Sequence, residues 1–343
     1  MIVIGVDAHK RTHTCAAVAE LTGRRVAMRS VAARETGLGT MLTWARALDE
    51  ARVWAIEDCR HVTGRLERFL IARGERVVRV ASRLTGAARR GGREPGKSDE
   101  IDALAIARVA IREGVDTLPA AYLDDAALEI RRLSDHRERL VGQRTALIND
   151  LRWQLHDLDP SFEVPARRMI LVRWQARTAQ LLDTMPASVQ VRIARDELER
   201  IGELTAAITS LHAELGDRVR AYRPGLLTLP GCGVLVAAKT IGETAGAQRF
   251  ATAAKFARIT GTAPIPTSSG TRVRYRLDPG GNRQLNTSLH RIAVTQLRVH
   301  PPARVYLDKK LAEGKTRREA IRCLKRQLAR TIYTTLKSEP LLT

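Results

Sequence analysis

The first 110 residues alternate between two patterns of apolar and polar positions, one typical of strands and one of helices. Helical spacing runs over 35–51 and again over 63–74, where Thr63 is placed to cap the start and Gly74 to close the end. Three strands, a helix, a strand, a helix and a strand is the order of an RNase H-like α/β domain, although other α/β folds can share it. The apolar runs predicted as strands are 1–8, 12–21, 24–33, 53–58 and 75–82.

The middle of the chain carries a helical repeat instead. Three leucines beginning at Leu133 are seven residues apart, and the apolar positions from Ile201 onward follow each other in steps of three and four. This spacing is typical of paired helices and predicts long helices over about 126–158 and 188–221, with a shorter one between them. A bundle within one chain and a coiled-coil arm that joins two copies fit the pattern equally well.

A turn feeding a helix is predicted over 226–243. Its Pro-Gly-Cys-Gly core resembles a helix-hairpin-helix turn, in which backbone N–H groups face a DNA phosphate, although a simple tight turn is commoner. The stretch 85–97 is rich in Gly and Arg and is predicted as a loop. We therefore expect an α/β domain at 1–125, a helical coiled-coil segment at 126–222 and a mainly α-helical domain at 223–343.

Charge narrows the class of partner. The chain has 58 Lys and Arg against 37 Asp and Glu, a formal net charge of +21, and from residue 271 onward 17 basic residues face 5 acidic ones. Such an excess predicts a polyanion, most often nucleic acid, with a membrane surface as the rival. No apolar run is long enough to span a bilayer, and the N-terminal residues are predicted as a strand rather than a signal peptide. The four scattered cysteines favour a reducing, cytoplasmic setting over a zinc site or a disulfide framework.

Two groups of basic residues are candidates for contact with this polyanion. One lies in the loop at 85–97, and the other on the polar face of a C-terminal helix predicted at 316–336. A solvated surface would carry the same residue types, but the net charge favours contact. The candidates are Arg89, Arg90 and Arg93 in the loop, and Arg318, Arg322, Lys325 and Arg326 on the helix.

Acidic residues fall at positions where a carboxylate is costly without a partner. Asp7 ends the first strand, and Glu57 ends the strand expected to pair beside it. Asp58 would point to the opposite side of the sheet. Asp99 and Asp102 are three residues apart at the start of a helix, so they share one face. Turn capping explains Asp7 equally well, and the helix dipole explains Asp99 better than Asp102.

These carboxylates come from three separate elements, which meet at one edge of the sheet in an RNase H-like domain. Four hard oxygen donors suit two Mg²⁺ ions roughly 3.5–4 Å apart, with Mn²⁺ as the alternative ion. Such a pair can clamp the attacking and leaving oxygens of a phosphoryl transfer. His9, two residues after Asp7, fits either proton transfer or an ordinary surface position.

The stretch 266–285 is polar and cationic, with almost nothing apolar to bury. A Ser-Ser-Gly sequence in such a loop is a turn in most proteins. The alternative is that Ser268 or Ser269 is a nucleophile facing a phosphate, and the residues alone do not decide between the two serines. The arginines that follow and could neutralise a phosphate are Arg272, Arg274 and Arg276.

Six stretches follow one another along the chain: GVDAHKRTH, AIEDCRHVTGRLERFL, KSDEIDALAIA, LPGCGVLVAAKTIGE, GTAPIPTSSGTR and GGNRQLNTSLHRIA. In this order and spacing they resemble the "one-ten" family of insertion-sequence transposases, also called DEDD recombinases. The resemblance extends over nearly the whole chain.

The resemblance implies a RuvC-like N-terminal domain, a coiled-coil segment and a C-terminal transposase domain with a nucleophilic serine. The family's serine precedes a glycine and follows a Gly-x-x-Pro turn. Gly261 and Pro264 match this turn and Ser269 precedes Gly270, with Ser268 as the second choice. The metal-binding residues that the resemblance implies are Asp7, Glu57, Asp99 and Asp102.

Two features depart from the family's pattern. Thr271 stands where relatives often carry a second glycine. Asp278 and Pro279 stand where a basic residue commonly precedes the later Gly-Asn. Both departures bear on the conformation of the loop more than on the identity of the serine.

The resemblance also implies partners and a reaction. Relatives act on donor and target DNA with a structured non-coding bridge RNA, and they assemble as dimers that pair into tetramers. The implied reaction is attack of Ser269 on a DNA phosphodiester, followed by release of the phosphoserine link to a hydroxyl of another strand. A RuvC-like nuclease that uses water, and a non-catalytic nucleic-acid-binding protein, are the alternatives. A sugar kinase or actin-like ATPase fits the first strand but lacks matching Gly-rich phosphate loops.

Overall fold

The computed structural model describes residues 1–57, 60–82, 84–86, 98–122, 124–267, 275–276 and 281–338. They form two compact units. The predicted domain limits at 125 and 222 remain a prediction. No helix in these ranges is both long and apolar enough to cross a bilayer. The first unit holds Met1–Asp124, Ala245–Asn286 and Arg318–Lys337, and the second holds Asp125–Thr244, Thr287–Arg317 and Ser338.

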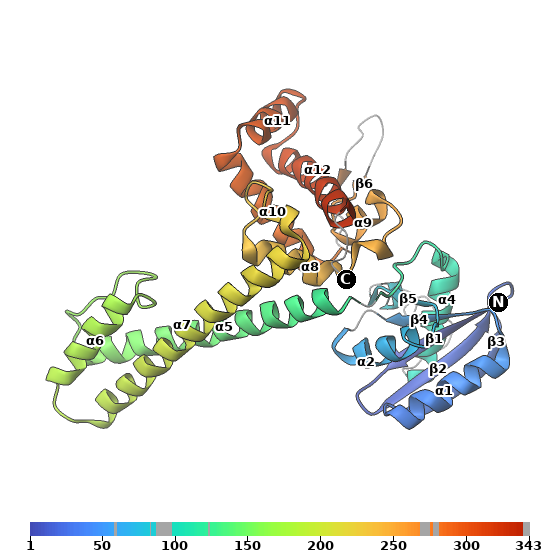
Figure 1. Ribbon diagram of the computed structural model, residues 1–343, viewed down its shortest axis with the longest axis horizontal. Helices are drawn as coiled ribbons and strands as arrows, with labels where there is room; N and C mark the ends of the chain where they lie inside the picture. The colour runs from blue at the N-terminus through green and yellow to red at the C-terminus, as the bar shows by residue number, and fades with distance from the viewer. Residues whose placement is uncertain are drawn as a thin grey trace. The chain divides into compact units, whose positions relative to one another are not determined.

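A five-stranded sheet forms the centre of the N-terminal part of the first unit (Figure 1). Its order is β3-β2-β1-β4-β5, with the first three strands antiparallel and β1, β4 and β5 parallel. This mixed arrangement fits the RNase H-like fold that the sequence predicted. The strands are β1 Ile2–Ala8, β2 Thr12–Ala19, β3 Arg25–Ala32, β4 Arg52–Glu57 and β5 Val77–Val80.

Helices cover both faces of this sheet. Alternate residues of β1 point to opposite faces, so Ile4 and Val6 enter one apolar core while Val3 enters the other. The first core is closed by α1 (Glu35–Leu48) and α2 (Arg60–Ile71), and the second by α4 (Asp99–Glu113). Because the central strands are buried on both sides, their sequences are continuous apolar runs rather than alternating ones.

Gly5 allows α4 to approach β1 closely. A Cβ at this position would lie 2.1 Å from the backbone O of Ala103 and 2.5 Å from the backbone N of Ala107. Both are backbone atoms of a helix, so neither can move aside unless the helix moves. The absence of a side chain at Gly5 therefore sets how closely β1 and α4 pack around Ala103 and Ala107.

Gly5→Ala is expected to lower the free energy of unfolding by about 1–3 kcal/mol, because the added methyl overpacks the contact between β1 and α4. Chemical denaturation measures this change. The matched control is Gly39→Ala, within α1, where a Cβ would meet nothing within 4 Å. That replacement is expected to raise stability by up to about 1 kcal/mol through helix propensity. Equal effects from both variants would contradict the close approach.

The prediction that Thr63 caps α2 is wrong. The helix begins at Arg60, and Thr63 lies inside it with its side chain buried. The first helical residues include Arg60 and His61, so the apolar spacing does not mark where the helix begins. Gly74 closes the end as predicted, with φ of 77° and its N–H donating to the carbonyl of Ile71 at 3.0 Å.

The second unit contains the two long helices of the middle segment, α5 (Asp125–Leu158) and α7 (Val189–Tyr222), with α6 (Val172–Thr184) between them. They agree with the helices predicted from the leucine spacing. α5 and α7 lie antiparallel along each other (Figure 1) and share an apolar core near α6. Leu147, the last leucine of the repeat, therefore packs within one chain, and a role of the repeat in joining two copies remains a prediction.

The predicted turn before α8 (Val234–Thr244) is held against α10 (Arg283–Val299). Gly231 has φ of 81°, and a Cβ there would lie 2.9 Å from the Cβ of Thr295. Gln296 Nε2 donates to the carbonyl of Pro230 at 2.9 Å. The other elements of this unit are η1 (Pro224–Leu226) and α11 (Pro301–Ala312).

The later segments of the first unit are joined by an aromatic cluster. The rings of Phe250 and Tyr333 both contact Phe256, and the Tyr333 hydroxyl donates to the carbonyl of Phe250 at 2.8 Å. These contacts anchor the last helix to the segment around residue 250. The elements are η2 (Ala247–Arg249), α9 (Ala253–Ile259), β6 (Ile265–Pro266), β7 (Tyr275–Arg276) and α12 (Arg317–Ser338).

Candidate active site

Asp7 lies near the end of β1, on the sheet face that α4 covers. It follows Gly5 by two residues, so both point toward that helix. Only 8% of Asp7 is exposed. The close packing at Gly5 therefore places a buried carboxylate beside the beginning of α4.

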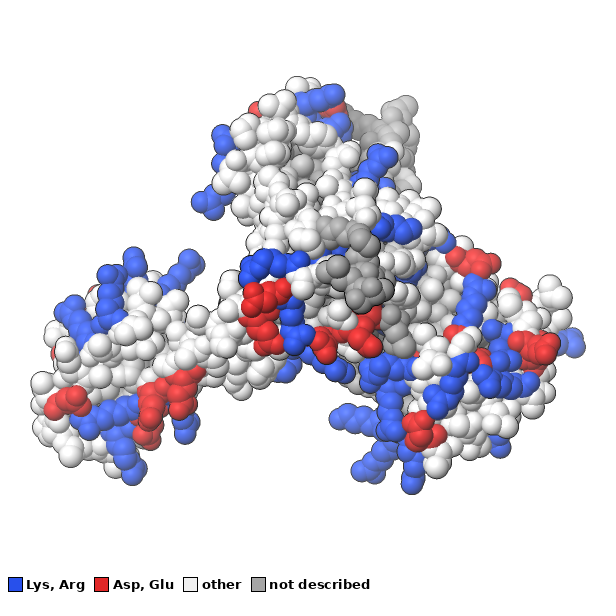
Figure 2. All heavy atoms as spheres, viewed as in Figure 1, with Lys and Arg blue, Asp and Glu red and all other residues white. Residues whose placement is uncertain are grey.

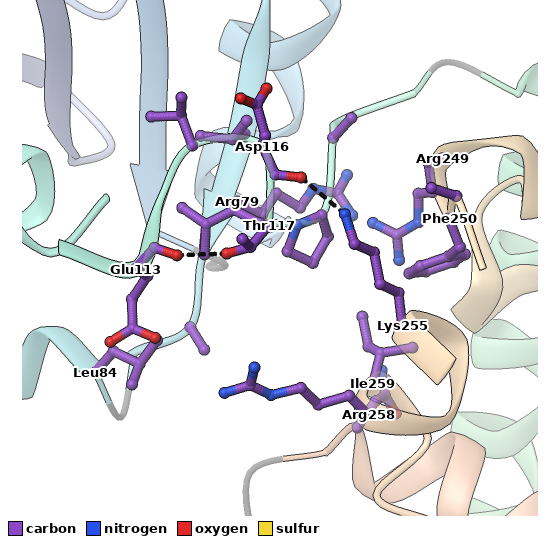
Figure 3. Close-up of a pocket in the computed structure, with 18 of the residues that line it drawn as sticks. Arg79, Leu84, Glu113, Asp116, Thr117, Arg249, Phe250, Lys255, Arg258 and Ile259 are labelled. Carbon is purple, nitrogen blue, oxygen red and sulfur yellow. Dashed lines mark hydrogen bonds between the residues drawn. The ribbon is translucent and has the colours of Figure 1, made fainter. Parts of the chain in front are cut away.

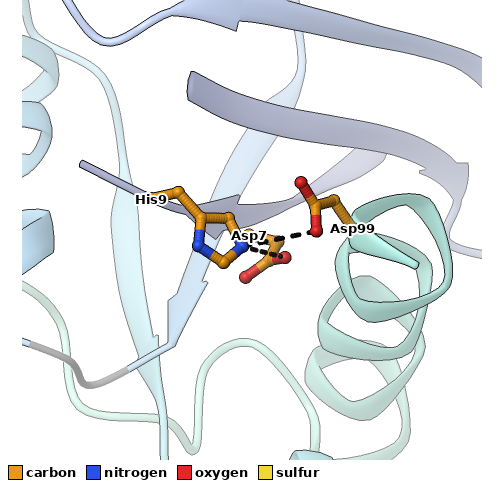
Figure 4. A group of neighbouring side chains, drawn as sticks. All are labelled: Asp7, His9 and Asp99. Carbon is orange, nitrogen blue, oxygen red and sulfur yellow. Dashed lines mark hydrogen bonds and ion pairs between the residues drawn. The ribbon is translucent and has the colours of Figure 1, made fainter. Parts of the chain in front are cut away.

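The first turn of α4 brings further carboxylates to this point. Ser98 caps the helix, since its hydroxyl accepts a hydrogen bond from the Ile101 N–H at 3.2 Å. His9 Nε2 lies 3.0 Å from Asp7 Oδ2 and 3.4 Å from Asp99 Oδ1 (Figure 4). Ligand atoms of these three side chains all lie within 4.8 Å of one another, so they could share one cation.

Burial raises the pKa of Asp7 above its ordinary value. The charge and hydrogen bond of His9 act in the opposite direction, while the negative charges of Asp102 and Asp99 raise the pKa further. Asp102 is thus close enough to Asp7 for its charge to raise the pKa of the Asp7 carboxyl. A cation at this site would offset both the burial and the repulsion, so the donor set fits a hard divalent ion.

Glu57 ends β4 next to β1, where Val6 pairs with Ile56. It shares the sheet face of Asp7, because Val53 and Ala55 at alternate positions pack in the core under α4. Its Oε1 accepts a hydrogen bond from Thr85 Oγ1 at 2.7 Å. The structure therefore brings Asp7, Asp99 and Asp102 together and places Glu57 on the same face, bonded to Thr85.

His9 is the residue whose role the sequence left open. Its place two residues after Asp7 was the only signal, and that spacing fits a surface position equally well. The structure puts the imidazole between two carboxylates, a position that depends on how close α4 lies to β1. The contact joins residues separated by 90 positions along the chain, so spacing could not predict it.

The predicted nucleophile lies outside the described residues. In sequence, Ser268 and Ser269 connect β6 to β7, which pair as antiparallel strands with Ile265 opposite Arg276. Arg276 is exposed on β7. The other residues predicted to contact nucleic acid that fall outside the described ranges are Arg89, Arg90, Arg93, Arg272 and Arg274.

Two of the predicted basic residues on α12, Arg322 and Arg326, are half-buried, and Arg322 lies 3.6 Å from Glu319. The prediction that Lys325 lies on the basic face is wrong, since only 5% of it is exposed. Both Leu324 and Leu328 beside it are buried too. Helical spacing placed Lys325 with the arginines, but the packing of α12 covers this part of the helix as well.

A hollow of about 510 Å³ lies elsewhere in the first unit (Figure 3). One wall contains Val78 of β5 and Leu118, and the other contains Arg249, Lys255 and Arg258. The Lys255 ammonium donates to the carbonyl of Asp116 at 2.8 Å. The Arg258 side chain extends into the hollow. Lys255 and Arg258 on this wall can hold phosphate oxygens, whereas Arg249 is buried.

Sequence reasoning missed this hollow because its walls are far apart along the chain.

Figure 2 shows further Lys and Arg side chains crowded around α2 on the viewed face. Charge spread in this way is typical of a protein that contacts the phosphate backbone at several places.

Comparison with known proteins identifies the class. Residues 4–160 match a model of DEDD transposases of the IS110 type, and residues 224–308 match the model described as the transposase IS116/IS110/IS902 family. The chain belongs to this family of transposases. Transposases cleave DNA, and those with this acidic set typically use divalent metal ions.

Relatives of this transposase are proteins of other insertion elements. The 42 kDa protein of IS900 from Mycobacterium paratuberculosis is 28% identical, over 97% of this chain and 95% of that protein. The 44.8 kDa protein of IS116 from Streptomyces clavuligerus is 25% identical, over 100% of this chain and 96% of that protein. Among solved structures, T. thermophilus RuvC in complex with a Holliday junction substrate is 18% identical and covers 35% of this transposase and 99% of RuvC, with a TM-score of 0.28. The fold assignment rests on the strand order instead.

Proposed function

We propose that this transposase cleaves and rejoins DNA through a covalent link between Ser269 and a DNA phosphate, beside Mg²⁺ held by Asp7, Glu57, Asp99 and Asp102. The observation that carries the acidic half of this proposal is the meeting of Asp7 and Asp99 from β1 and α4. Asp7 is buried and is repelled by the negative charge of Asp99, which is costly unless a cation neutralises the carboxylates. The serine half rests on the sequence resemblance.

Bound ions would neutralise phosphate oxygens and assist deprotonation of an attacking hydroxyl. The protein's own part is to hold the ligands rigidly. Asp7 is fixed on a central strand, Asp99 and Asp102 are fixed on a capped helix, and the Thr85 hydroxyl orients Glu57. His9 Nε2 lies between the two carboxylates, 3.0 Å from Asp7 Oδ2 and 3.4 Å from Asp99 Oδ1.

The serine chemistry balances without ATP. The Ser269 oxygen forms a bond to the DNA phosphorus, the bond from phosphorus to a deoxyribose oxygen breaks, and the serine proton passes to a base. The departing deoxyribose oxygen takes up a proton. In the second step a hydroxyl of another strand attacks the same phosphorus, and the Ser269 oxygen leaves and regains its proton. One bond forms and one breaks in each step.

We further propose that a non-coding bridge RNA selects donor and target DNA, and that dimers pair into tetramers for strand exchange. The net charge of +21 supports a large polyanionic partner. The α5–α7 hairpin is a candidate for subunit contact. Both proposals follow from the family resemblance.

The experiment that tests the proposal is covalent trapping. The full-length protein is mixed with Mg²⁺, the RNA transcribed from the flank of its gene, and labelled donor and target DNA. We expect a denaturation-resistant, protease-sensitive adduct. Cleaved DNA with no adduct would instead identify a hydrolytic nuclease that needs only the acidic cluster. Binding without cleavage, unchanged by EDTA, would identify a non-catalytic protein.

The hollow with Lys255 and Arg258 is expected to contact phosphates of the bound nucleic acid. The slope of log affinity against log salt concentration is negative. In the double variant Lys255→Ala/Arg258→Ala it should become shallower, by roughly one for each phosphate that the protein no longer neutralises. Titration of labelled DNA or RNA at several salt concentrations measures the slope. The matched control is Arg24→Ala/Arg25→Ala, which removes two exposed arginines at the start of β3. A slope equal to that of the wild type would exclude the contact.

A further inference from the structure

The two ends of the segment that carries Ser269 meet in the structure. Residues 262–280 begin after Gly261 and end before Gly281. A Cβ on Gly281 would lie only 2.2 Å from the backbone N of Gly261. Next to this contact, the Asn282 N–H donates to the carbonyl of Ile259 at 2.6 Å. The two backbones therefore touch at the base of the segment, with no room for a side chain at Gly281.

Asn286 ties this base together from its position on α10. Its Nδ2 donates to the carbonyl of Thr260 at 2.9 Å and to that of Gly261 at 3.3 Å. Its Oδ1 accepts from Lys325 Nζ. An ammonium group can only donate, so Lys325 requires the amide oxygen to face it. The amide N–H groups are then turned toward the two carbonyls.

Lys325 is an unusual choice for a structural contact. Only 5% of it is exposed, and no carboxylate pairs with it in the part of the chain that the structure describes. Burial, together with the positive charge of Arg322, lowers the pKa of Lys325 to about 8. A buried charge without an ion-pair partner costs stability. Lys325 is therefore explained better by the group it orients than by a contribution to folding.

We propose that Lys325, acting through Asn286, is a positioning residue that closes the base of segment 262–280 and so holds Ser269 for attack. This inference rests on the covalent mechanism proposed above. Displacement of a reacting group by about 1 Å can slow a reaction roughly a hundred-fold. If the two ends of segment 262–280 were held loosely, the rate of adduct formation would therefore fall, while DNA binding would change little.

Two variants break the link at different bonds. Asn286→Asp keeps an acceptor for Lys325, but its second oxygen then faces the carbonyls of Thr260 and Gly261 and cannot donate to them. Lys325→Met keeps the unbranched apolar stem and removes the donor. For each we expect adduct formation at saturating DNA to slow roughly a hundred-fold, with little change in DNA affinity.

Lys239→Met is the matched control. Lys239 is also a buried lysine, 8% exposed in the second unit, with Asp135 and Glu138 each 2.9 Å from its Nζ. Its replacement should lower the melting temperature, because the ion pairs with these two carboxylates are lost, and leave the adduct rate of the folded protein unchanged. Lys325→Met should not lower the melting temperature at pH 7, because it removes a penalised charge. If Lys325 served stability instead, Lys325→Met would lower the melting temperature and leave the adduct rate of the folded protein unchanged.

Hydrogen exchange of the full-length protein separates this inference from the covalent mechanism, because it requires no catalysis. Backbone amides of 262–281 should exchange faster in Asn286→Asp and Lys325→Met than in the wild type, and at the wild-type rate in Lys239→Met. Unchanged exchange in both test variants overturns the inference. Faster exchange with an undiminished adduct rate overturns it too. A wild type that forms no adduct through Ser269 overturns the proposed mechanism, while the exchange data still decide whether the base is closed.

Discussion

Ser269→Ala abolishes the covalent protein–DNA adduct and slows strand exchange by about ten-thousand-fold or more, if this serine is the nucleophile. The physical reason is that the methyl group of alanine has no oxygen with which to bond the phosphorus. DNA affinity should change little, because the neighbouring arginines and the acidic cluster remain. Denaturing electrophoresis of labelled DNA measures the adduct, and filter binding measures the affinity.

Ser268→Ala is the control for this replacement, since it removes a neighbouring hydroxyl of the same loop. It should retain the adduct. Disappearance of the adduct in Ser268→Ala alone would identify Ser268 as the nucleophile. An adduct undiminished in both variants would show that neither serine forms the link.

The second large effect is expected from Asp7→Asn, which should slow DNA cleavage roughly a thousand-fold or more, because it removes the charge of a proposed metal ligand from the acidic cluster. The amide is close in size and shape to the carboxylate, so the fold should survive. Without divalent ions the variant should melt at the same temperature as the wild type or higher, because the repulsion from Asp99 and Asp102 is gone. Cleavage assays and thermal melts in EDTA measure the two effects.

Added Mg²⁺ provides a readout that does not depend on activity. A ligand that binds only the folded state raises the melting temperature, so Mg²⁺ should stabilise the wild type and have little effect on Asp7→Asn. Glu100→Gln is the matched control, since Glu100 lies beside Asp99 in the first turn of α4 but is not one of the proposed ligands. It should keep both cleavage and the Mg²⁺ shift. Equal Mg²⁺ shifts in the wild type and Asp7→Asn would place the metal elsewhere.

Local patterns were sufficient for most of the secondary structure. Continuous apolar runs marked β1 and β4 because those strands are buried on both faces. The leucine spacing marked α5 and α7 because one face of each helix is apolar over many turns. The start of α2 was missed, since the first turn of a helix can be polar and Thr63 then looks like a cap.

The candidate acids could be selected from the sequence because a carboxylate at the end of an apolar strand is conspicuous. Asp7 and Glu57 were chosen on that ground, and Asp99 and Asp102 on helical spacing. Their roles as ligands stay a prediction. Which of them approach one another depends on Gly5, which sets how near α4 lies to β1.

The sequence by itself determined the order of strands and helices, the basic character of the chain, the candidate acids and the family resemblance. Each of these depends on residues close together along the chain or on composition. Only the tertiary structure decided that His9 lies between Asp7 and Asp99, that α5 pairs with α7, and that Lys325 is buried against Asn286. These contacts join positions far apart along the chain, and they depend on side-chain packing and backbone approach, which no local pattern records.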